Sequence, residues 1–167
     1  MNQAYLALGS NIRAEFNLPQ AVRLLESCGR ILRKSSIWQS QPVGDENQAD
    51  FLNAAVLWET ACDAQQIWDE VIPGIGARLL RVRDPLNKNG PRTIDIDLVL
   101  YNREQLQIAH RIVPDPEISS RIFLAVPLAE LAPEYQVPGL GRPVSEIAAE
   151  LQADNEAVFF RRDDVQL

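Results

Sequence analysis

Two aspartates, Asp95 and Asp97, interrupt a run of branched apolar residues in the segment 90–101. The apolar run predicts a buried β-strand. Because side chains alternate between the two faces of a strand, both carboxylates project from the same face and lie close together. Such a pair is costly, since the two charges repel each other and both lose hydration. A divalent cation would remove both costs.

The metal that fits this pair is Mg²⁺, which proteins usually hold through one or two carboxylates together with the phosphates of a substrate. Arg92 lies shortly before Asp95, and a guanidinium forms paired hydrogen bonds with phosphate oxygens. Gly90 and Pro91 give the strand a rigid entry. The alternative is that the aspartates form only the solvated face of a half-exposed strand. The arginine and the rigid entry favour the metal site.

Length and composition predict a single domain over residues 1–167 with a substantial core. The chain is 46% hydrophobic, and no apolar run reaches the length of a membrane span. The N-terminus lacks the charged and then apolar pattern of a signal peptide. Cys28 and Cys62 have no metal-binding spacing, and we interpret them as reduced core thiols of a cytoplasmic protein. A lone histidine, His110, excludes a histidine-cluster metal site.

The charge distribution indicates an anionic small molecule as ligand. The net charge of −7 argues against a general nucleic-acid-binding protein. Residues 78–121 nevertheless contain eight of the 16 Lys and Arg residues and only six of the 23 Asp and Glu residues. This concentration of basic residues around the aspartate pair suits a nucleotide better than a polymer. The alternative is a basic surface patch without a ligand.

The expected strands and helices alternate along the chain. Strands are expected at 4–8, 31–38, 51–60 and 94–101. Helices are expected at 18–28, from 63 or 64 to a break at Pro73-Gly74, and at 144–151. We also expect polar loops at 40–48 and 84–90, a hairpin-like segment at 112–114, a helical turn near Ser119 and an irregular apolar segment at 124–131. This order predicts an α+β sandwich with helices on one face of a mainly antiparallel sheet.

Several blocks of sequence, in order along nearly the whole chain, match the pattern of one protein family. They are 7–11 (ALGSN), 35–44 (SSIWQSQPVG), 51–55 (FLNAA), 81–97 (RVRDPLNKNGPRTIDID), 113–114 (VP) and 121–124 (RIFL). Together they resemble the 6-hydroxymethyl-7,8-dihydropterin pyrophosphokinases of folate biosynthesis. The resemblance implies a ferredoxin-like α+β fold. It also implies transfer of the terminal two phosphates of ATP to the pterin hydroxymethyl group, with release of AMP.

The resemblance assigns roles on the nucleotide side. Asp95 and Asp97 would hold two Mg²⁺ ions that bridge the triphosphate and the attacking hydroxyl. With Arg92 they would form the catalytic set, in which the ions lower the pKa of the hydroxyl and neutralise charge at the β-phosphorus. The residues expected to contact ATP are Arg83, Arg92, Leu98 and Arg121, with Leu98 at the adenine.

The resemblance also implies a pterin pocket. Phe51 and Phe123 match positions that sandwich the flat pterin ring, and offset stacking explains aromatic residues there. Asn53 can both donate to and accept from the ring edge. Ser40 and Val43 lie where a loop backbone contacts the pterin. Taken singly, the aromatic residues would be assigned to the core and Asn53 to a turn or strand end, so their joint match carries the prediction.

Four positions depart from the family pattern, all on the nucleotide side. Asp115 stands where the family usually has a histidine near the ATP phosphates, and Gly76 stands where it has a glutamate that helps bind the nucleotide. Leu80 replaces a usual glycine, and the loop tryptophan near Asn89 is missing. These departures keep a second function open: a pterin- or nucleotide-binding paralogue with weak or no kinase activity, acting as a binding or regulatory module. In either case we expect small-molecule partners, no nucleic acid or membrane, and a monomer.

Overall fold

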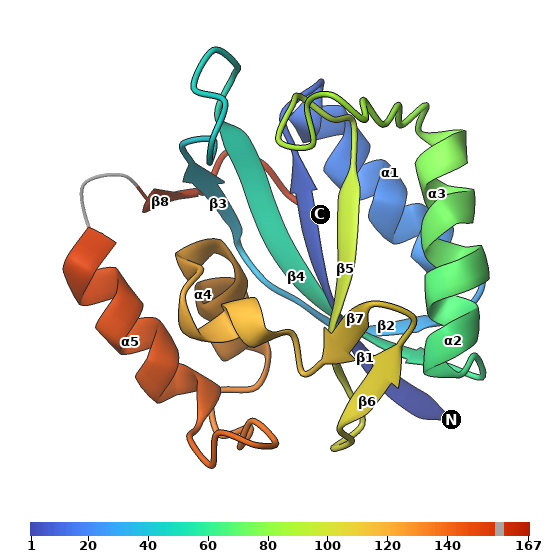
Figure 1. Cartoon of the computed structure of the whole chain (residues 1–167), viewed down its shortest axis with the longest axis vertical. Coiled ribbons are helices and arrows are strands. Elements are labelled where there is room, and N and C mark those ends of the chain that lie inside the picture. Colours follow the sequence, from blue (N-terminus) through green and yellow to red (C-terminus); the bar gives the residue numbers. More distant parts are fainter. Residues whose placement is uncertain (156–158) are drawn as a thin grey trace.

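The computed structural model describes residues 1–155 and 159–167. At its centre lies an antiparallel, six-stranded sheet with the strand order β5-β1-β4-β3-β8, in which β2 also pairs with β4 (Figure 1). Its strands are β1 (Asn2–Ser10), β2 (Arg30–Lys34), β3 (Ile37–Ser40), β4 (Phe51–Thr60), β5 (Asp95–Tyr101) and β8 (Phe159–Arg162). A separate hairpin of β6 (Leu106–Ile108) and β7 (Arg111–Val113) contacts β5 through β7.

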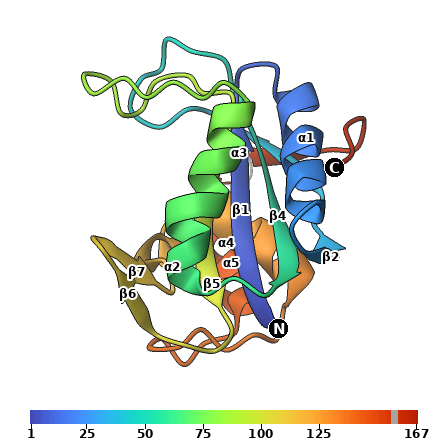
Figure 2. The same cartoon turned by 90° about the vertical axis from the view of Figure 1, so that its right-hand side faces the viewer.

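Helices cover both faces of the sheet (Figures 1 and 2). One face carries α1 (Ala14–Glu26) and the continuous helix formed by α2 (Ala64–Gln66), η1 (Ile67–Val71) and α3 (Ile72–Arg78). The other carries the short η2 (Pro116–Ser119), α4 (Ile122–Leu131) and α5 (Val144–Asn155). The α+β class is confirmed, but the expectation of helices on only one face is wrong. The reason is that β1 and β4 are apolar at nearly every position, which is typical of strands buried on both sides.

The helix over residues 64–78 continues past Pro73-Gly74, where the sequence predicts a break. Its η1 segment is a π-helical turn, in which the N–H of Ile72 donates to the carbonyl of Ile67, five residues earlier. Pro73 then lies in the first turn of α3, where the helix does not require its missing N–H. A local change of helix type therefore accommodates the proline.

The segment 124–131 also differs from expectation, because it is part of helix α4 and not irregular. This helix packs against both β4 and α5 and buries Leu124, Val126, Leu128 and Leu131. A helix enclosed by neighbours needs no polar face, so its sequence shows no 3.6-residue alternation. In addition, the expected strand at 31–38 divides into β2 and β3, and β8 was not expected. The remaining predicted strands, helices, turn and polar loops are confirmed.

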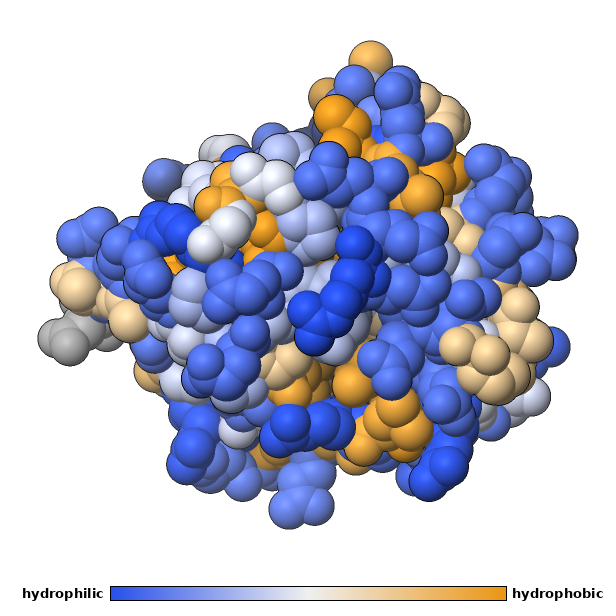
Figure 3. All heavy atoms as spheres, turned by 90° about the horizontal axis from the view of Figure 1, so that it is seen from below, coloured by the Kyte–Doolittle hydropathy of each residue, from blue (hydrophilic) through white to orange (hydrophobic). Residues whose placement is uncertain are grey.

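Most of the described surface on the face shown in Figure 3 is hydrophilic, with apolar residues in separate patches. No helix within residues 1–155 and 159–167 is both long enough and apolar enough to cross a membrane. Three large apolar side chains are nevertheless strongly exposed: Leu80 at 79%, Val82 at 80% and Leu86 at 97%. All three belong to the segment that joins α3 to β5, beside the cavity described next.

Candidate active site

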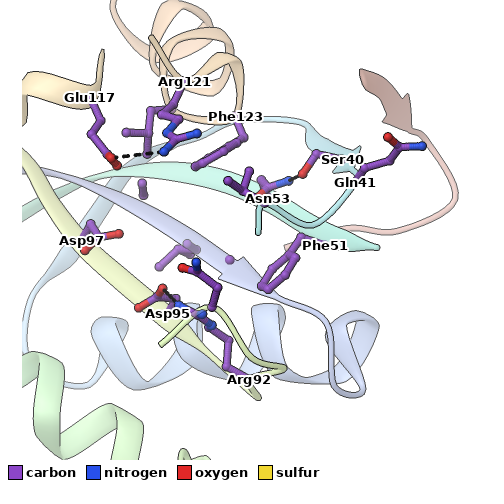
Figure 4. A pocket seen from close by; sticks show the side chains of 16 residues that line it. Ser40, Gln41, Phe51, Asn53, Arg92, Asp95, Asp97, Glu117, Arg121 and Phe123 are labelled. Atoms are coloured by element: carbon purple, nitrogen blue, oxygen red, sulfur yellow. Dashed lines mark hydrogen bonds and ion pairs between the residues drawn. The ribbon is translucent and has the colours of Figure 1, made fainter. Parts of the chain in front are cut away.

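A cavity of about 220 Å³ opens at one end of the sheet, between β1, β4, β5 and the start of α4 (Figure 4). Nine of the eleven predicted site residues line it, so the fold gathers residues that are far apart in the sequence. They are Ser40, Val43, Phe51, Asn53, Arg92, Asp95, Asp97, Arg121 and Phe123. Glu117, which forms an ion pair of 3.5 Å with Arg121, also lines the cavity.

The strand register explains why this region is hollow. Gly9 of β1 lies between Asp95 of β5 and Asn53 of β4, and Ala7 lies beside Asp97. A Cβ at Gly9 would lie 3.7 Å from Asn53 Oδ1 and 4.0 Å from Asp95 Cβ, so it would occupy the floor of the cavity. The small residues of β1 therefore leave open space between a carboxylate on one side and a carboxamide on the other.

Arginines bind the two aspartates of β5. Asp95 accepts hydrogen bonds on both oxygens, from Arg81 Nη1 at 2.5 Å and from Arg92 Nη1 at 2.7 Å. Asp97 is held less tightly, since its Oδ1 lies 3.7 Å from Arg111 Nη2. Both aspartates face the cavity from the same side of β5, as the sequence predicts (Figure 4).

The different partners move the two carboxyl pKa values apart. Burial alone would raise the pKa of Asp95, but the charges and hydrogen bonds of Arg81 and Arg92 outweigh it and lower that pKa. Burial and the charge of Asp95 together raise the pKa of Asp97 to about 7, against the smaller opposing effect of Arg111. At neutral pH the free pair therefore carries less than two full negative charges, and a bound cation would favour full ionisation.

The donor set of this pair fits Mg²⁺. Two carboxylates face a cavity large enough for additional oxygen ligands from a substrate, which is how Mg²⁺ is usually bound. Within residues 1–155 and 159–167 there is no cluster of three or more His, Cys, Asp or Glu residues that could hold a metal alone. A metal here would thus depend on the ligand for its remaining coordination.

On the opposite side of the cavity, Asn53 is held in one orientation. Its Nδ2 donates to the carbonyl of Trp38 at 3.1 Å and to Ser40 Oγ at 2.8 Å, which leaves its Oδ1 on the side of Gly9. Phe51, from β4, and Phe123, from α4, lie on either side of Asn53 (Figure 4). This arrangement can receive a flat ring between two aromatic side chains and hydrogen-bond its edge.

The two polar loops beside the cavity hold each other. Asn87 Nδ2 donates to Asp45 Oδ2 at 2.8 Å, and Gln48 Nε2 donates to the carbonyl of Asn89 at 2.6 Å. Gly44 allows the close approach: its φ is +90°, and a Cβ there would lie 2.6 Å from Asn89 Nδ2. The loops therefore meet at one edge of the cavity as a joined pair.

Two of the predicted site residues lie outside this cavity. Arg83 is exposed and lines a separate cavity of about 260 Å³ with Gly76 and Ile96, on the other face of β5. Leu98 is also turned to that face and is 6% exposed in the core. Strand alternation is the reason, because Leu98 follows Asp97 directly. Neither side chain lines the main cavity, and their expected contacts with ATP stay predictions.

Two arginines that were not assigned a role contact the aspartate pair instead. Arg81 binds Asp95 and also donates to the carbonyl of Ile94 at 2.6 Å, while its Nε is buried without a partner in the described part of the chain. Arg111 faces Asp97 from the β6–β7 hairpin. Arg81 belongs to the family block at 81–97 and could have been proposed. Only the local excess of basic residues pointed to Arg111.

The structure shows the local surroundings of three of the departures from the family pattern. Asp115 accepts the backbone N–H of Glu117 at 2.8 Å and so caps η2. Leu80 has a φ of +57°, the left-handed region that favours glycine, which accounts for the glycine usual at this position. At Gly76, a Cβ would lie 3.7 Å from Arg81 Cβ, so packing does not require a glycine there.

Comparisons with known proteins show which family the chain belongs to. Residues 5–133 match the sequence pattern of the family described as 7,8-dihydro-6-hydroxymethylpterin-pyrophosphokinase (HPPK). A 2-amino-4-hydroxy-6-hydroxymethyldihydropteridine pyrophosphokinase of Bacillus subtilis (strain 168) is 41% identical over 138 residues, which are 81% of each chain. A protein of the same name from Haemophilus influenzae is 32% identical over 154 residues, 90% of this chain and 91% of its own.

Solved structures agree on the fold. The wild-type HPPK-DHPS of Plasmodium falciparum, crystallised with pterin and p-hydroxybenzoate, superposes on 96% of this chain with a TM-score of 0.76 and 15% sequence identity. This chain spans 45% of that longer protein. The sequence pattern covers well over half of the chain and the curated relatives cover most of it, so the protein belongs to the HPPK family of pyrophosphokinases.

Proposed function

We propose that this protein transfers pyrophosphate from ATP to the hydroxymethyl group of 6-hydroxymethyl-7,8-dihydropterin, releasing AMP, as a step of folate biosynthesis. One observation carries the proposal: a single cavity places a carboxylate pair opposite an aromatic slot with an oriented carboxamide. A pterin in the slot would have its hydroxymethyl group directed towards Asp95 and Asp97. Such proximity of the acceptor to the metal-binding groups is what phosphoryl transfer requires.

On the pterin side, Phe51 and Phe123 would stack on the two faces of the ring. Asn53 would accept a hydrogen bond from the ring edge through Oδ1, because its amide group is already engaged by Trp38 and Ser40. Ser40 and Val43 would close the outer side of the slot. The resulting recognition requires a flat, apolar-faced ring with a donor at its edge, which describes a pterin.

On the phosphate side, Asp95 and Asp97 would hold two Mg²⁺ ions. When bound, these ions neutralise triphosphate charge and lower the pKa of the pterin hydroxyl. Arg92 and Arg121 line the same cavity and would contact phosphate oxygens. Arg92 also donates to the backbone carbonyls of Gly90 and Lys88, so it is held beside Asp95 and would present its charge to a phosphate from that position. Arg81, bonded to Asp95 and the strand backbone, would keep that carboxylate in place.

We further propose that the protein acts as a monomer in the cytoplasm. Cys28 is exposed and so is not the core thiol that the sequence predicts, while Cys62 is half-buried against the core. Both are free, which is compatible with a reducing compartment in which ATP is available.

The test is a direct assay with ATP, Mg²⁺ and 6-hydroxymethyl-7,8-dihydropterin, in which AMP and the pterin diphosphate are quantified together. Equal amounts of the two products are expected, and chelation of Mg²⁺ should abolish both. A 6-methyl pterin, which lacks the acceptor hydroxyl, should bind without giving AMP. Binding of ATP and pterin without any AMP would instead support the alternative of a non-catalytic binding module, for which the charge of Asp115 is the main structural argument.

A further inference from the structure

Arg111 lies beside the candidate site but has no role in the function proposed above. Its Nη2 is 3.7 Å from Asp97 Oδ1, and its guanidinium carbon is 5.0 Å from the ring centre of Trp68, a residue of η1. The guanidinium thus rests between a candidate metal ligand and an aromatic face. Its side chain is 44% exposed, so it can change partners without disturbing the core.

Little room is left between this arginine and the residues that it packs on. A cavity of about 10 Å³ lies between Trp68, Leu98, Arg111 and Val113, and it is no larger than one water molecule. Asp97 borders both this space and the main cavity, so the two are neighbours. A nucleoside attached to a triphosphate at Asp97 would find room on this side only if Arg111 moved away from Trp68.

The charges indicate where Arg111 would go. Asp97 and Asp115 both line the small cavity. Mg²⁺ on Asp97 would neutralise that carboxylate and weaken its hold on Arg111, whereas the charge of Asp115 would still repel a triphosphate nearby. Arg81 and Arg92 are already engaged by Asp95. Arg111 contacts Asp97 through a long and partly exposed ion pair, which is weak and easily exchanged. A guanidinium can readily exchange a carboxylate partner for a phosphate, because its fork of N–H groups matches the oxygens of both.

We propose that Arg111 is a phosphate-binding residue that rests on Trp68 and Asp97 in the free protein and turns to the triphosphate when MgATP binds. The inference rests on the proposed function for the position of the nucleotide. The family pattern has a histidine at the position of Asp115. In this chain, Arg111 of the β6–β7 hairpin would supply the corresponding positive charge. This chain would thereby keep its affinity for ATP despite the acidic replacement.

The test measures binding to the full chain by calorimetry, with MgATP, MgAMP and the pterin as separate ligands. Arg111→Leu should weaken MgATP about tenfold and change MgAMP and pterin affinity less than twofold, whereas Arg111→Lys should lose less. Arg103→Leu is the matched control, since Arg103 also lies over an aromatic ring, at 5.3 Å from that of Tyr135, but away from the cavity. Trp68 emission should change on adding MgATP, and Trp68→Phe should abolish the change.

Unchanged or tighter MgATP binding by Arg111→Leu would overturn the inference, because Arg111 would then only neutralise Asp97 or obstruct the nucleotide. Equal losses for MgATP and MgAMP would also overturn it, since the arginine would not act on the β- and γ-phosphates. If Arg111→Leu fails to fold, Arg111→Lys decides: wild-type affinity for MgATP together with unchanged Trp68 emission refutes the inference. Selective loss of MgATP affinity in a protein that releases no AMP would refute the proposed function and leave this inference intact.

Discussion

The two halves of the candidate site are built differently. The pterin half consists of neutral groups on paired strands, in which Asn53 is oriented by Trp38 and Ser40. The phosphate half consists of charged groups that come largely from a loop and a hairpin, in which Arg92 and Arg111 pair with the aspartates of β5. The first half is ready to receive its ligand, whereas the second is occupied by its own ion pairs.

The pterin half is also anchored from behind. Trp38 Nε1 donates to Glu130 Oε1 of α4 at 2.5 Å, and the same carboxylate accepts the backbone N–H of Ser36 at 2.8 Å. The Trp38 ring stacks on Phe159 with ring centres 4.8 Å apart. These contacts fix β3 against a helix and a neighbouring strand. The phosphate half is anchored more locally, by hydrogen bonds from Arg81 and Arg92 to backbone carbonyls within residues 88–94, and its loop includes a left-handed residue, Leu80.

The difference has a physical basis. A neutral hydrogen-bonding group can be held in its final orientation at little cost, since its partners are also neutral. A cluster of carboxylates must be neutralised whether or not a ligand is present, because buried unpaired charge is expensive. In the free protein, ion pairs with arginine side chains therefore neutralise the carboxylates that would otherwise bind the metal and the phosphates. Substitutions in the two halves should accordingly have separable effects on chemistry, binding and stability.

The largest expected effect is on turnover, from the phosphate half. Asp97→Asn and Asp95→Asn should each lower the rate of AMP release by a factor of roughly hundreds, on the scale of losing one electrostatic stabiliser. Pterin affinity should change little, because the pterin slot lies on the other side of Gly9. Product quantification and pterin titration measure the two effects. Near-normal AMP release in either variant would rule out the metal assignment.

Asn53→Ala should have its effect in the pterin half. We expect a loss of roughly 1–3 kcal/mol in pterin binding, because a polar group at the ring edge is left unpaired. MgATP affinity should remain unchanged. Calorimetric titration with each ligand tests this separation. Parallel losses for pterin and MgATP would mean that Asn53 supports the structure and that the two halves are not independent.

The raised pKa of Asp97 predicts how the stability of the free protein depends on pH. Its carboxyl has a pKa of about 7 in the folded state against 3.8 as the reference value, so the folded state binds more protons between these limits. Stability should therefore fall as pH rises from about 4 to 7, by an amount of order 2 kcal/mol. Asp97→Asn should flatten this dependence and exceed the wild type in stability at pH 8. Urea unfolding across the pH range measures it, and identical profiles would contradict the prediction.

Asp115 provides a sharper probe of the phosphate half, because its cap and its charge can be separated. Asp115→Asn keeps a capping oxygen and removes the charge, so it should tighten MgATP by up to about tenfold without loss of stability. Asp115→His should lose the cap of η2 and destabilise the protein by about 1 kcal/mol. Titration and thermal unfolding distinguish the two. If both variants bind MgATP like the wild type, the charge of Asp115 does not reach the nucleotide.

The smallest expected effect concerns Leu80. A non-glycine residue in the left-handed region costs roughly 1–2 kcal/mol, and glycine loses roughly 0.5–1 kcal/mol more entropy on folding. Leu80→Gly should therefore stabilise the protein by about 0.5–1 kcal/mol, since the exposed side chain makes little packing contribution. Val82→Gly, at a position without a positive φ, is the control and should destabilise. A destabilised Leu80→Gly variant would show that the strained loop is held by contacts of the leucine.

Local sequence was sufficient for several features. The i and i+2 spacing of Asp95 and Asp97 determined that both carboxylates share one face of a strand, because strand periodicity is a property of the backbone. The family blocks determined the fold class and nine residues of the cavity. The same periodicity, applied one residue further, gives Leu98 the opposite face, where the structure has it.

Other features were decided only by tertiary structure. Helices cover both faces of the sheet, and α4 lacks a polar side, because burial on all sides removes the periodic pattern that reveals an element in sequence. The pairing of Arg81 with Asp95 and of Arg111 with Asp97 depends on how a loop and a hairpin return to β5. Ion pairs join residues through space, and no local spacing encodes them. The sequence by itself therefore determined which groups do chemistry here, and the tertiary structure decided which charges those groups meet.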